Sequence, residues 1–240
     1  MLETWQGIPT TEQDRFLREM FANFLSDMKV RICSARNRRR TLQQVERDAL
    51  QHATTVHKRS LNFYGREELQ EALRVRVLHP GGTAVVVHGD SGSGKTSLMC
   101  KLGVTLRQSL PAGASVVVRL CGTTPLSSSV CELLWGVCTQ LAKARAGHAQ
   151  SKKEELPAVP STTDFEGLVE CFAAMLATAS EVAPIAVLLD SLDQLTDRDR
   201  GRSQPHKWLP LTGLNPHVHL LLSSLSTEYV YARPSCGHSA

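Results

Sequence analysis

The chain has 240 residues, of which 42% are hydrophobic and 21% are charged, and its formal net charge is +4. This composition is ordinary for a soluble globular protein, and the length allows one large domain or two small ones. The mild charge does not by itself indicate nucleic-acid binding. The most apolar long stretch, residues 171–192, contains Glu181, Pro184 and Asp190. We therefore predict a helix and a strand there, and no membrane span.

The seven cysteines include no C-x-x-C pair and no spacing typical of a zinc site. The N-terminus lacks the basic and apolar regions of a signal peptide. We therefore expect reduced, buried thiols in a cytoplasmic protein, with a nuclear location as the alternative.

Residues 1–58 are predicted to form an N-terminal helical segment. Phe16, Met20, Phe24 and Met28 recur every four residues and make an apolar stripe on a helix over about 11–34. Because acidic residues lie among the basic ones, we expect the stripe to pack on a partner helix or the next domain rather than on a membrane. A second helix is predicted from Thr41 to about residue 57.

Between these helices lies the run Arg36-Asn-Arg-Arg-Arg40. We expect it to be a solvated interhelical turn, while phosphate contact or a nuclear address is the alternative. His52 and His57, on the second helix, are expected at the surface rather than as metal ligands.

Residues 89–96 fit the phosphate-loop pattern G-x-x-x-x-G-K-[ST] at every fixed position. The apolar run Ala84–His88 predicts a buried strand before it, and helical spacing of leucines follows, which is the context this motif requires. Backbone N–H groups of such a loop bind phosphate. The predicted nucleotide-binding residues of the loop are Gly89, Asp90, Ser91, Gly92, Ser93, Gly94, Lys95, Thr96 and Ser97.

Within that loop, Lys95 is expected to reach the β and γ phosphates of ATP or ADP, and the Thr96 hydroxyl to ligate Mg²⁺. The second metal ligand is predicted about a hundred residues later, where the apolar strand 185–189 runs into Asp190. A parallel sheet presents its ligands at this end of its strands. Asp193 lies just beyond, on the same rim.

Strands alternate with helices along residues 59–228. We predict strands at about 84–88, 115–120, 185–189 and 218–223, and helices at about 66–79, 95–110, 125–147 and from 163 onward. This alternation indicates an α/β fold, with a mainly parallel sheet in a three-layer αβα arrangement. A strand interposed between the two motifs predicts the RecA/AAA-like branch of phosphate-loop NTPases, with the final strand ending near the γ-phosphate at Ser223 and Ser224.

Together these motifs resemble a NACHT-type domain of the STAND ATPases. Three runs look especially similar to the NACHT and WD-repeat proteins, namely those at 119–129, 189–195 and 208–210. The resemblance implies an ATP/ADP-driven switch that controls oligomerisation and signalling. It also implies that Phe63, Tyr64 and Arg66 lie near the adenine.

Three departures from the family pattern qualify this resemblance. Many NACHT domains place a glutamate, the base for water attack, where this chain has Gln194; a glutamine orients water but does not take its proton. Many also place an arginine near Ser223 to bind the γ-phosphate. Finally, the chain stops soon after the last strand, so a fragment or truncated isoform without WD repeats is expected, with the phosphate-loop strand at an exposed sheet edge.

The sequence therefore predicts an N-terminal helical segment (1–58), a NACHT-like nucleotide-binding domain (59–228) and a disordered tail (229–240). The leading hypothesis is a Mg²⁺-dependent ATP/ADP-binding switch that hydrolyses ATP slowly at most, with Asp193, Gln194 and Ser223 as the candidate catalytic residues. A protein partner or self-association through the helices and sheet edge is expected. One alternative is a non-catalytic scaffold with a vestigial site, and another is a nucleic-acid-coupled ATPase, which depends on residues 36–40 alone.

Overall fold

The computed structural model describes residues 11–79, 82–148, 157–196 and 207–226, and the predicted tail at 229–240 lies outside them. Along the first helix, side chains are described at 19–20, 22, 24–31 and from 43 onward. The chain divides into two compact units, Met1–Gln44 and Val45–Ala240. The two motifs of the candidate nucleotide site both lie in the second unit.

The N-terminal segment is one helix, α1, which spans Thr11–Leu61. The prediction of two helices joined by a turn at residues 36–40 was therefore wrong. Residues 11–61 contain neither glycine nor proline, and arginine is a good helix former, so nothing in the local chemistry ends the helix there. The arginine side chains of that run lie outside the described side chains.

The second unit is built on four parallel strands, β1 (Val85–Gly89), β2 (Ser115–Leu120), β3 (Ile185–Asp190) and β4 (Val218–Leu225). Their order across the sheet is β1-β4-β3-β2. The α/β prediction is confirmed. The strand between the phosphate-loop strand and the strand that ends at Asp190 is β4, as in the RecA/AAA-like branch, whereas strand 115–120, which separates the two motifs in sequence, is β2 at the far edge of the sheet. Among the described strands, β1 pairs with β4 alone and so forms one edge of the sheet.

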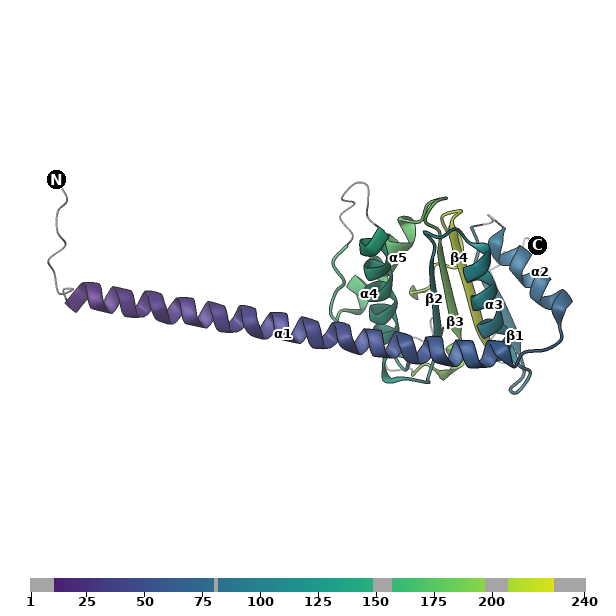
Figure 1. Ribbon diagram of the computed structural model, residues 1–240, viewed down its shortest axis with the longest axis horizontal. Coiled ribbons are helices and arrows are strands. Elements are labelled where there is room, and N and C mark those ends of the chain that lie inside the picture. The colour runs from purple at the N-terminus through teal and green to yellow at the C-terminus, as the bar shows by residue number, and fades with distance from the viewer. Residues whose placement is uncertain (1–10, 80–81, 149–156, 197–206, 227–240) are drawn as a thin grey trace, which may run out of the picture. The chain divides into compact units, whose positions relative to one another are not determined.

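Helices cover both faces of this sheet and complete the three layers (Figure 1). Helices α2 (Glu67–Leu78) and α3 (Lys95–Ser109) bury leucines and Met99 against one face. Helices α4 (Val130–His148) and α5 (Phe165–Ala177) bury a larger apolar cluster against the other. The apolar runs of β3 and β4 are buried on both faces, which explains why they do not alternate with polar residues.

Two short 3₁₀ helices follow strands at the edge of the sheet where the site lies. The first, η1 (Pro125–Ser127), starts where the sequence predicted the beginning of a long helix, and α4 begins only at Val130. Thr124 and Ser127 form a reciprocal capping box around this single turn, which explains the separate element. The second, η2 (Leu192–Gln194), follows β3 directly. No helix within the described residues is long and apolar enough to cross a membrane.

Candidate nucleotide site

The phosphate loop connects β1 to the first turn of α3, as the sequence predicted. Gly92 and Gly94 have φ angles of 78° and 87°, a region that glycine enters without steric cost. A Cβ at Gly92 would meet no atom within 4 Å, so the loop is open on that side. Such a loop, followed by a helix N-terminus, forms a concave surface of backbone donors suited to phosphate.

Lys95 is folded over this loop. Its Nζ donates hydrogen bonds to the carbonyl oxygens of Gly89, at 2.7 Å, and Asp90, at 2.8 Å. Thr96 and Ser97 follow in the first turn of α3 and are partly exposed. The ammonium group and the Thr96 hydroxyl are therefore both placed at the phosphate end of the helix.

Asp190 ends β3 and is almost completely buried, at 1% exposure. One carboxylate oxygen accepts a hydrogen bond from the Ser223 hydroxyl at 2.6 Å, and the other accepts from the Ser191 hydroxyl at 3.1 Å. The Ser223 oxygen in turn accepts the backbone N–H of Ser191 at 2.8 Å. Ser191 has a φ of 58°, and these hydrogen bonds hold it in that uncommon conformation. The Ser223 hydroxyl is thus bonded to the carboxylate, and its predicted role near the γ-phosphate stays a prediction.

The end of β4 links the two motifs of the site. The Ser226 hydroxyl donates to the Asp90 carboxylate in the phosphate loop at 2.9 Å, while Ser223 donates to Asp190. Burial, with a smaller effect from the Asp190 charge, raises the pKa of the Cys100 thiol in α3 to about 12. β1, which runs into the loop, and β3, which ends at Asp190, both pair in parallel with β4, so their carboxyl ends lie at one edge of the sheet. The carboxylate and the loop therefore belong to one site.

Asp193 and Gln194 lie in η2, beyond Asp190. The Gln194 amide donates to the Asp193 carboxylate at 2.6 Å, and Asp193 is buried while Gln194 is exposed. Gly122, which follows β2, has a φ of 74°, and a Cβ there would lie 2.8 Å from the Gln194 Cβ. The segment after β2 consequently packs directly against the glutamine that replaces the usual acid.

On the predicted adenine side, Arg66 contacts the loop. Its guanidinium donates to the Ser93 carbonyl at 2.9 Å, and its φ of 60° places it in the left-handed region just before α2. Phe63 packs on the apolar cluster of α2 and α3. Tyr64 is 86% exposed. Of these three residues, Arg66 is thus brought to the loop, whereas Phe63 packs on the apolar cluster and the Tyr64 side chain remains in solvent.

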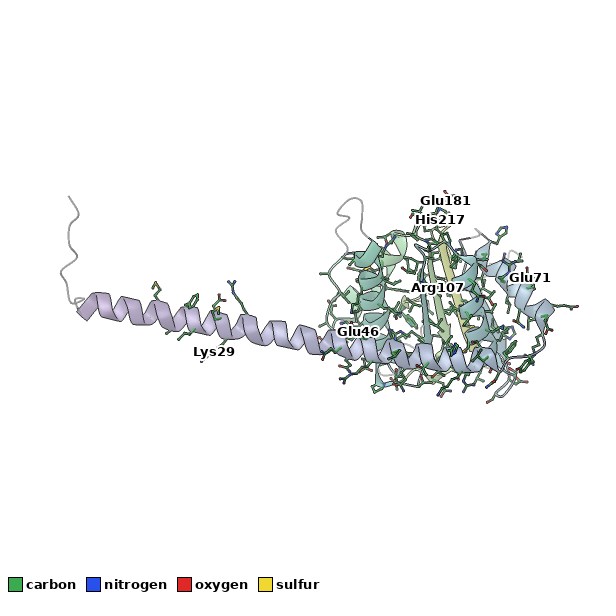
Figure 2. All side chains as sticks on the ribbon, in the orientation of Figure 1. Lys29, Glu46, Glu71, Arg107, Glu181 and His217 are labelled. Carbon is green, nitrogen blue, oxygen red and sulfur yellow. The ribbon has the colours of Figure 1, made fainter. Side chains whose placement is uncertain are left out.

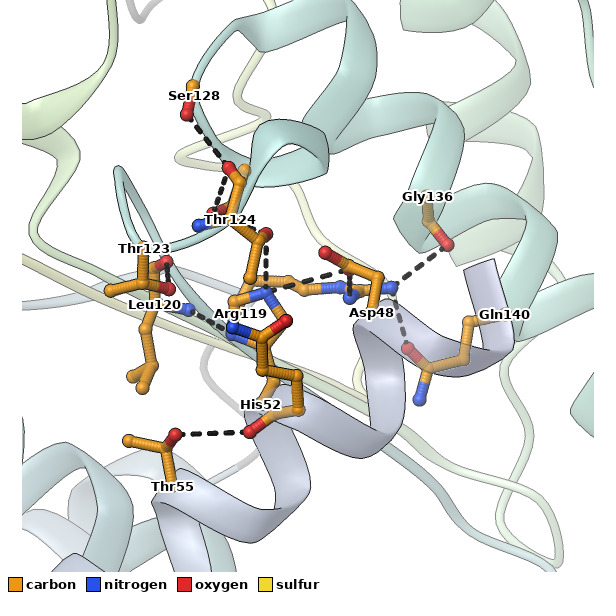
Figure 3. Close-up of polar contacts among 12 residues, drawn as sticks. Asp48, His52, Thr55, Arg119, Leu120, Thr123, Thr124, Ser128, Gly136 and Gln140 are labelled. Atoms are coloured by element: carbon orange, nitrogen blue, oxygen red, sulfur yellow. Dashed lines mark hydrogen bonds and ion pairs between the residues drawn. The ribbon is translucent and has the colours of Figure 1, made fainter. Parts of the chain in front are cut away.

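A buried polar cluster that the sequence did not predict lies at the carboxyl end of β2 (Figure 3). Arg119 on β2 forms an ion pair with Asp48 of α1 and donates to the Gln140 side chain of α4 at 3.0 Å. Its Nε has no hydrogen-bond partner among the described residues. An arginine within the apolar strand Ser-Val-Val-Val-Arg-Leu was the available signal, because a buried charge requires a partner.

His52 belongs to the same cluster, and its predicted surface position was wrong. It is 2% exposed, its Nδ1 accepts the backbone N–H of Leu120 at 3.3 Å, and its Nε2 lies 3.2 Å from the Thr124 hydroxyl. Burial, and then the nearby Arg119 charge, lower the pKa of His52 to about 4 despite the opposing effect of Asp48. His57, as predicted, is exposed.

The residues of the site fit a magnesium nucleotide. The loop is open at Gly92, Lys95 and Thr96 supply an ammonium and a hydroxyl in the first turn of α3, and Asp190 supplies a carboxylate at the end of β3. Within the described residues, no group of three or more His, Cys, Asp or Glu side chains could hold an ion by itself.

Residues 62–205 match the family described as the AAA ATPase domain. The chain belongs to this family. It is also 34% identical over 169 residues to the human NACHT domain- and WD repeat-containing protein 1, covering 68% of this chain and 10% of that protein. The human NACHT and WD repeat domain-containing protein 2 is 29% identical over 151 residues, with 60% and 8% covered. The mouse form of the first relative is 33% identical over 174 residues, with 70% and 10% covered.

These comparisons confirm the resemblance to NACHT-type phosphate-loop domains and support a nucleotide-binding module. The chain spans about a tenth of the length of the curated relatives it matches. The activities and partners of those whole proteins are therefore not assigned to this chain by the comparisons.

Proposed function

We propose that this chain is a Mg²⁺-dependent ATP/ADP-binding switch module that hydrolyses ATP slowly at most and acts in regulated assembly. The observation that carries the proposal is the end of β4, where Ser223 holds Asp190 and Ser226 holds Asp90 of the phosphate loop. Strand β4 and the residue that follows it thus contact both the Asp190 carboxylate and the phosphate loop, so a change at the γ-phosphate has a direct route to the sheet.

The residues take distinct roles in this proposal. The backbone of the loop 89–94 binds the phosphates, and Lys95 leaves the carbonyls of Gly89 and Asp90 to neutralise the β and γ oxygens. Thr96 and Asp190 would hold the magnesium ion, which would neutralise phosphate charge. Arg66 braces the loop through Ser93, and Phe63 offers an apolar surface towards the base.

Slow hydrolysis follows from the residues beyond Asp190. A general base must accept a proton from the attacking water, and Gln194 has no such capacity. The Asp193 carboxylate could accept one, but it is buried and bonded to the Gln194 amide. The arrangement therefore favours a long-lived bound nucleotide over rapid turnover.

The alternative is a non-catalytic interaction module with a vestigial site, and Gln194 is the observation that favours it. The open loop, the bonded Asp190 and the placement of Lys95 argue against it, because a site no longer used has no need to keep these contacts. Nucleotide binding separates the two possibilities.

The decisive experiment measures retention of labelled ATP with Mg²⁺ by the full chain and by Lys95→Ala. We expect binding by the wild type and its loss in the variant, since the phosphates lose their cation. Lys101→Ala, two turns along the same helix, is the matched control and should bind normally. Equal retention by the wild type and Lys95→Ala would refute the proposal.

A further inference from the structure

The first unit carries an apolar stripe on α1 that is exposed to solvent. Met20, Phe24 and Met28 are 47%, 58% and 41% exposed, and Leu25 beside them is 56% exposed. Residues four apart lie on one side of a helix, so these side chains form a continuous band. Figure 2 shows the described side chains along this part of α1, with Lys29 labelled.

Such a stripe is unfavourable on a lone helix. Helices in water gain most of their stability from packing an apolar face, and local propensity contributes little. Contiguous exposed apolar residues of this kind mark an interaction surface. The stripe is therefore expected to bind a partner surface.

The stripe is symmetric about its centre. Met20 and Met28 lie four residues before and after Phe24, so a second copy running in the opposite direction would place methionine against methionine and phenylalanine against phenylalanine. Closed pairs of identical chains use self-complementary patches of this type. Methionine also adapts its shape readily to a facing surface.

The charges on α1 determine the direction of such a pair. Residues 12–19 contain three acidic and two basic side chains, which gives a net charge of −1, whereas residues 29–40 contain six basic side chains and no acidic ones, which gives +6. A parallel pair would bring the two +6 segments side by side, within the roughly 8–10 Å over which such charges interact at moderate salt. An antiparallel pair centred on Phe24 brings each +6 segment beside a −1 segment.

We propose that the stripe Met20–Phe24–Met28 binds a second copy of this chain in an antiparallel helix pair. This proposal rests on the proposed function, which includes regulated assembly, and it names a second copy of the chain as the partner. Its test measures oligomeric state without nucleotide, so its failure and the failure of nucleotide binding are distinguishable.

The first experiment is sedimentation velocity of the full chain over a concentration series. We expect a monomer–dimer equilibrium for the wild type, and a dissociation constant at least about tenfold weaker for Phe24→Glu, because each dimer then carries two charges in its apolar centre. Val30→Glu is the matched control. Val30 is 61% exposed and lies on another side of the helix, so this variant should dimerise like the wild type.

The second experiment determines the direction of the pair by disulfide trapping. In a background in which Cys33 and Cys236 are serine, Met20→Cys and Met28→Cys proteins are mixed and oxidised. An antiparallel pair forms the mixed 20–28 disulfide and few 20–20 bridges, since the two copies of position 20 are then about 12 Å apart along the axis. A parallel pair forms the 20–20 bridge.

Three outcomes would overturn the proposal. They are a wild-type chain that stays monomeric throughout the series, a dimer that Phe24→Glu leaves intact, and trapping of the 20–20 bridge. A monomer that co-sediments through this stripe with phosphatidylserine-containing vesicles would assign the surface to membranes and would equally reject it.

Discussion

At the scale of single residues, we propose that the pair Asp193 and Gln194 controls how fast the site hydrolyses a bound nucleotide. The amide of Gln194 is 2.6 Å from the Asp193 carboxylate, so a glutamate at this position would put two carboxyl groups in contact. Two like charges at that distance raise the pKa of one of them. A carboxylate with a raised pKa is a better general base near neutral pH.

Gln194→Glu is therefore expected to accelerate ATP hydrolysis. General-base catalysis typically contributes about 10²–10⁴-fold, so we expect a gain of at least about 10²-fold in single-turnover experiments, with a rate that rises with pH as the new carboxyl loses its proton. Gln194→Ala is the control and should show no gain. If Gln194→Glu turns over no faster than wild type while still binding ATP, the assigned role of this position is wrong.

At the scale of elements, the cluster of Asp48, His52 and Arg119 holds the last part of α1 against the edge strand β2. His52 caps the outward backbone N–H of Leu120, and Asp48 neutralises Arg119 within the protein. A buried ion pair costs desolvation free energy that an apolar contact would not. It specifies one alignment of helix and strand, since a shift of the helix would leave both charges unpaired.

The pH dependence of stability should depend on His52. Above about pH 6.5 the imidazole is neutral in both the folded and unfolded chain, so it has no effect there. As the pH falls from 6.5 towards its folded pKa of about 4, the unfolded chain takes up a proton that the folded chain does not, and stability is lost. The loss is up to about 3 kcal/mol at about 1.4 kcal/mol per pH unit.

Urea unfolding of wild type and His52→Gln at pH 4 to 7 measures this effect. The difference in unfolding free energy between the two proteins should shrink as the pH is lowered, because the variant has no imidazole to protonate. Other groups, including His219, whose pKa is also lowered by burial, titrate in both proteins and cancel in the comparison. Parallel curves across this range would exclude His52 as the source.

The phosphate loop could be predicted from the sequence and the cluster of Asp48, His52 and Arg119 could not, because the loop is one continuous stretch and the cluster is assembled by folding. Residues 84–102 contain a strand, a loop and a helix within one continuous stretch, so local pattern sufficed. His52 and Arg119 are far apart in the sequence, and only the folded chain shows that each is buried by the other's element. The arginine run at 36–40 suggested a turn by composition, but a helix without glycine or proline continues through it. The hydrogen bond from Ser223 to Asp190 likewise depends on the pairing of β3 with β4.

At the scale of the whole molecule, the second unit encloses the nucleotide site between a sheet and helices that are far apart in sequence. The phosphate loop begins α3, Asp190 ends β3, and β4 lies between β1 and β3. A ligand that contacts all three binds the folded state and has no equivalent site in the unfolded chain. Nucleotide binding is therefore linked to the stability of the unit.

The size of this linkage gives a test that needs no catalysis. ATP with Mg²⁺ at a hundredfold excess over its dissociation constant stabilises the folded state by about 2.7 kcal/mol. For a domain of this size the melting temperature should rise by about 5–10 °C. Lys95→Ala should melt at the same temperature with and without nucleotide, and removal of Mg²⁺ by EDTA should reduce the wild-type shift because Asp190 and Thr96 then lose their ion. A wild-type chain whose melting temperature does not respond to ATP or ADP would point to the vestigial site, since the loop alone would then be insufficient for binding.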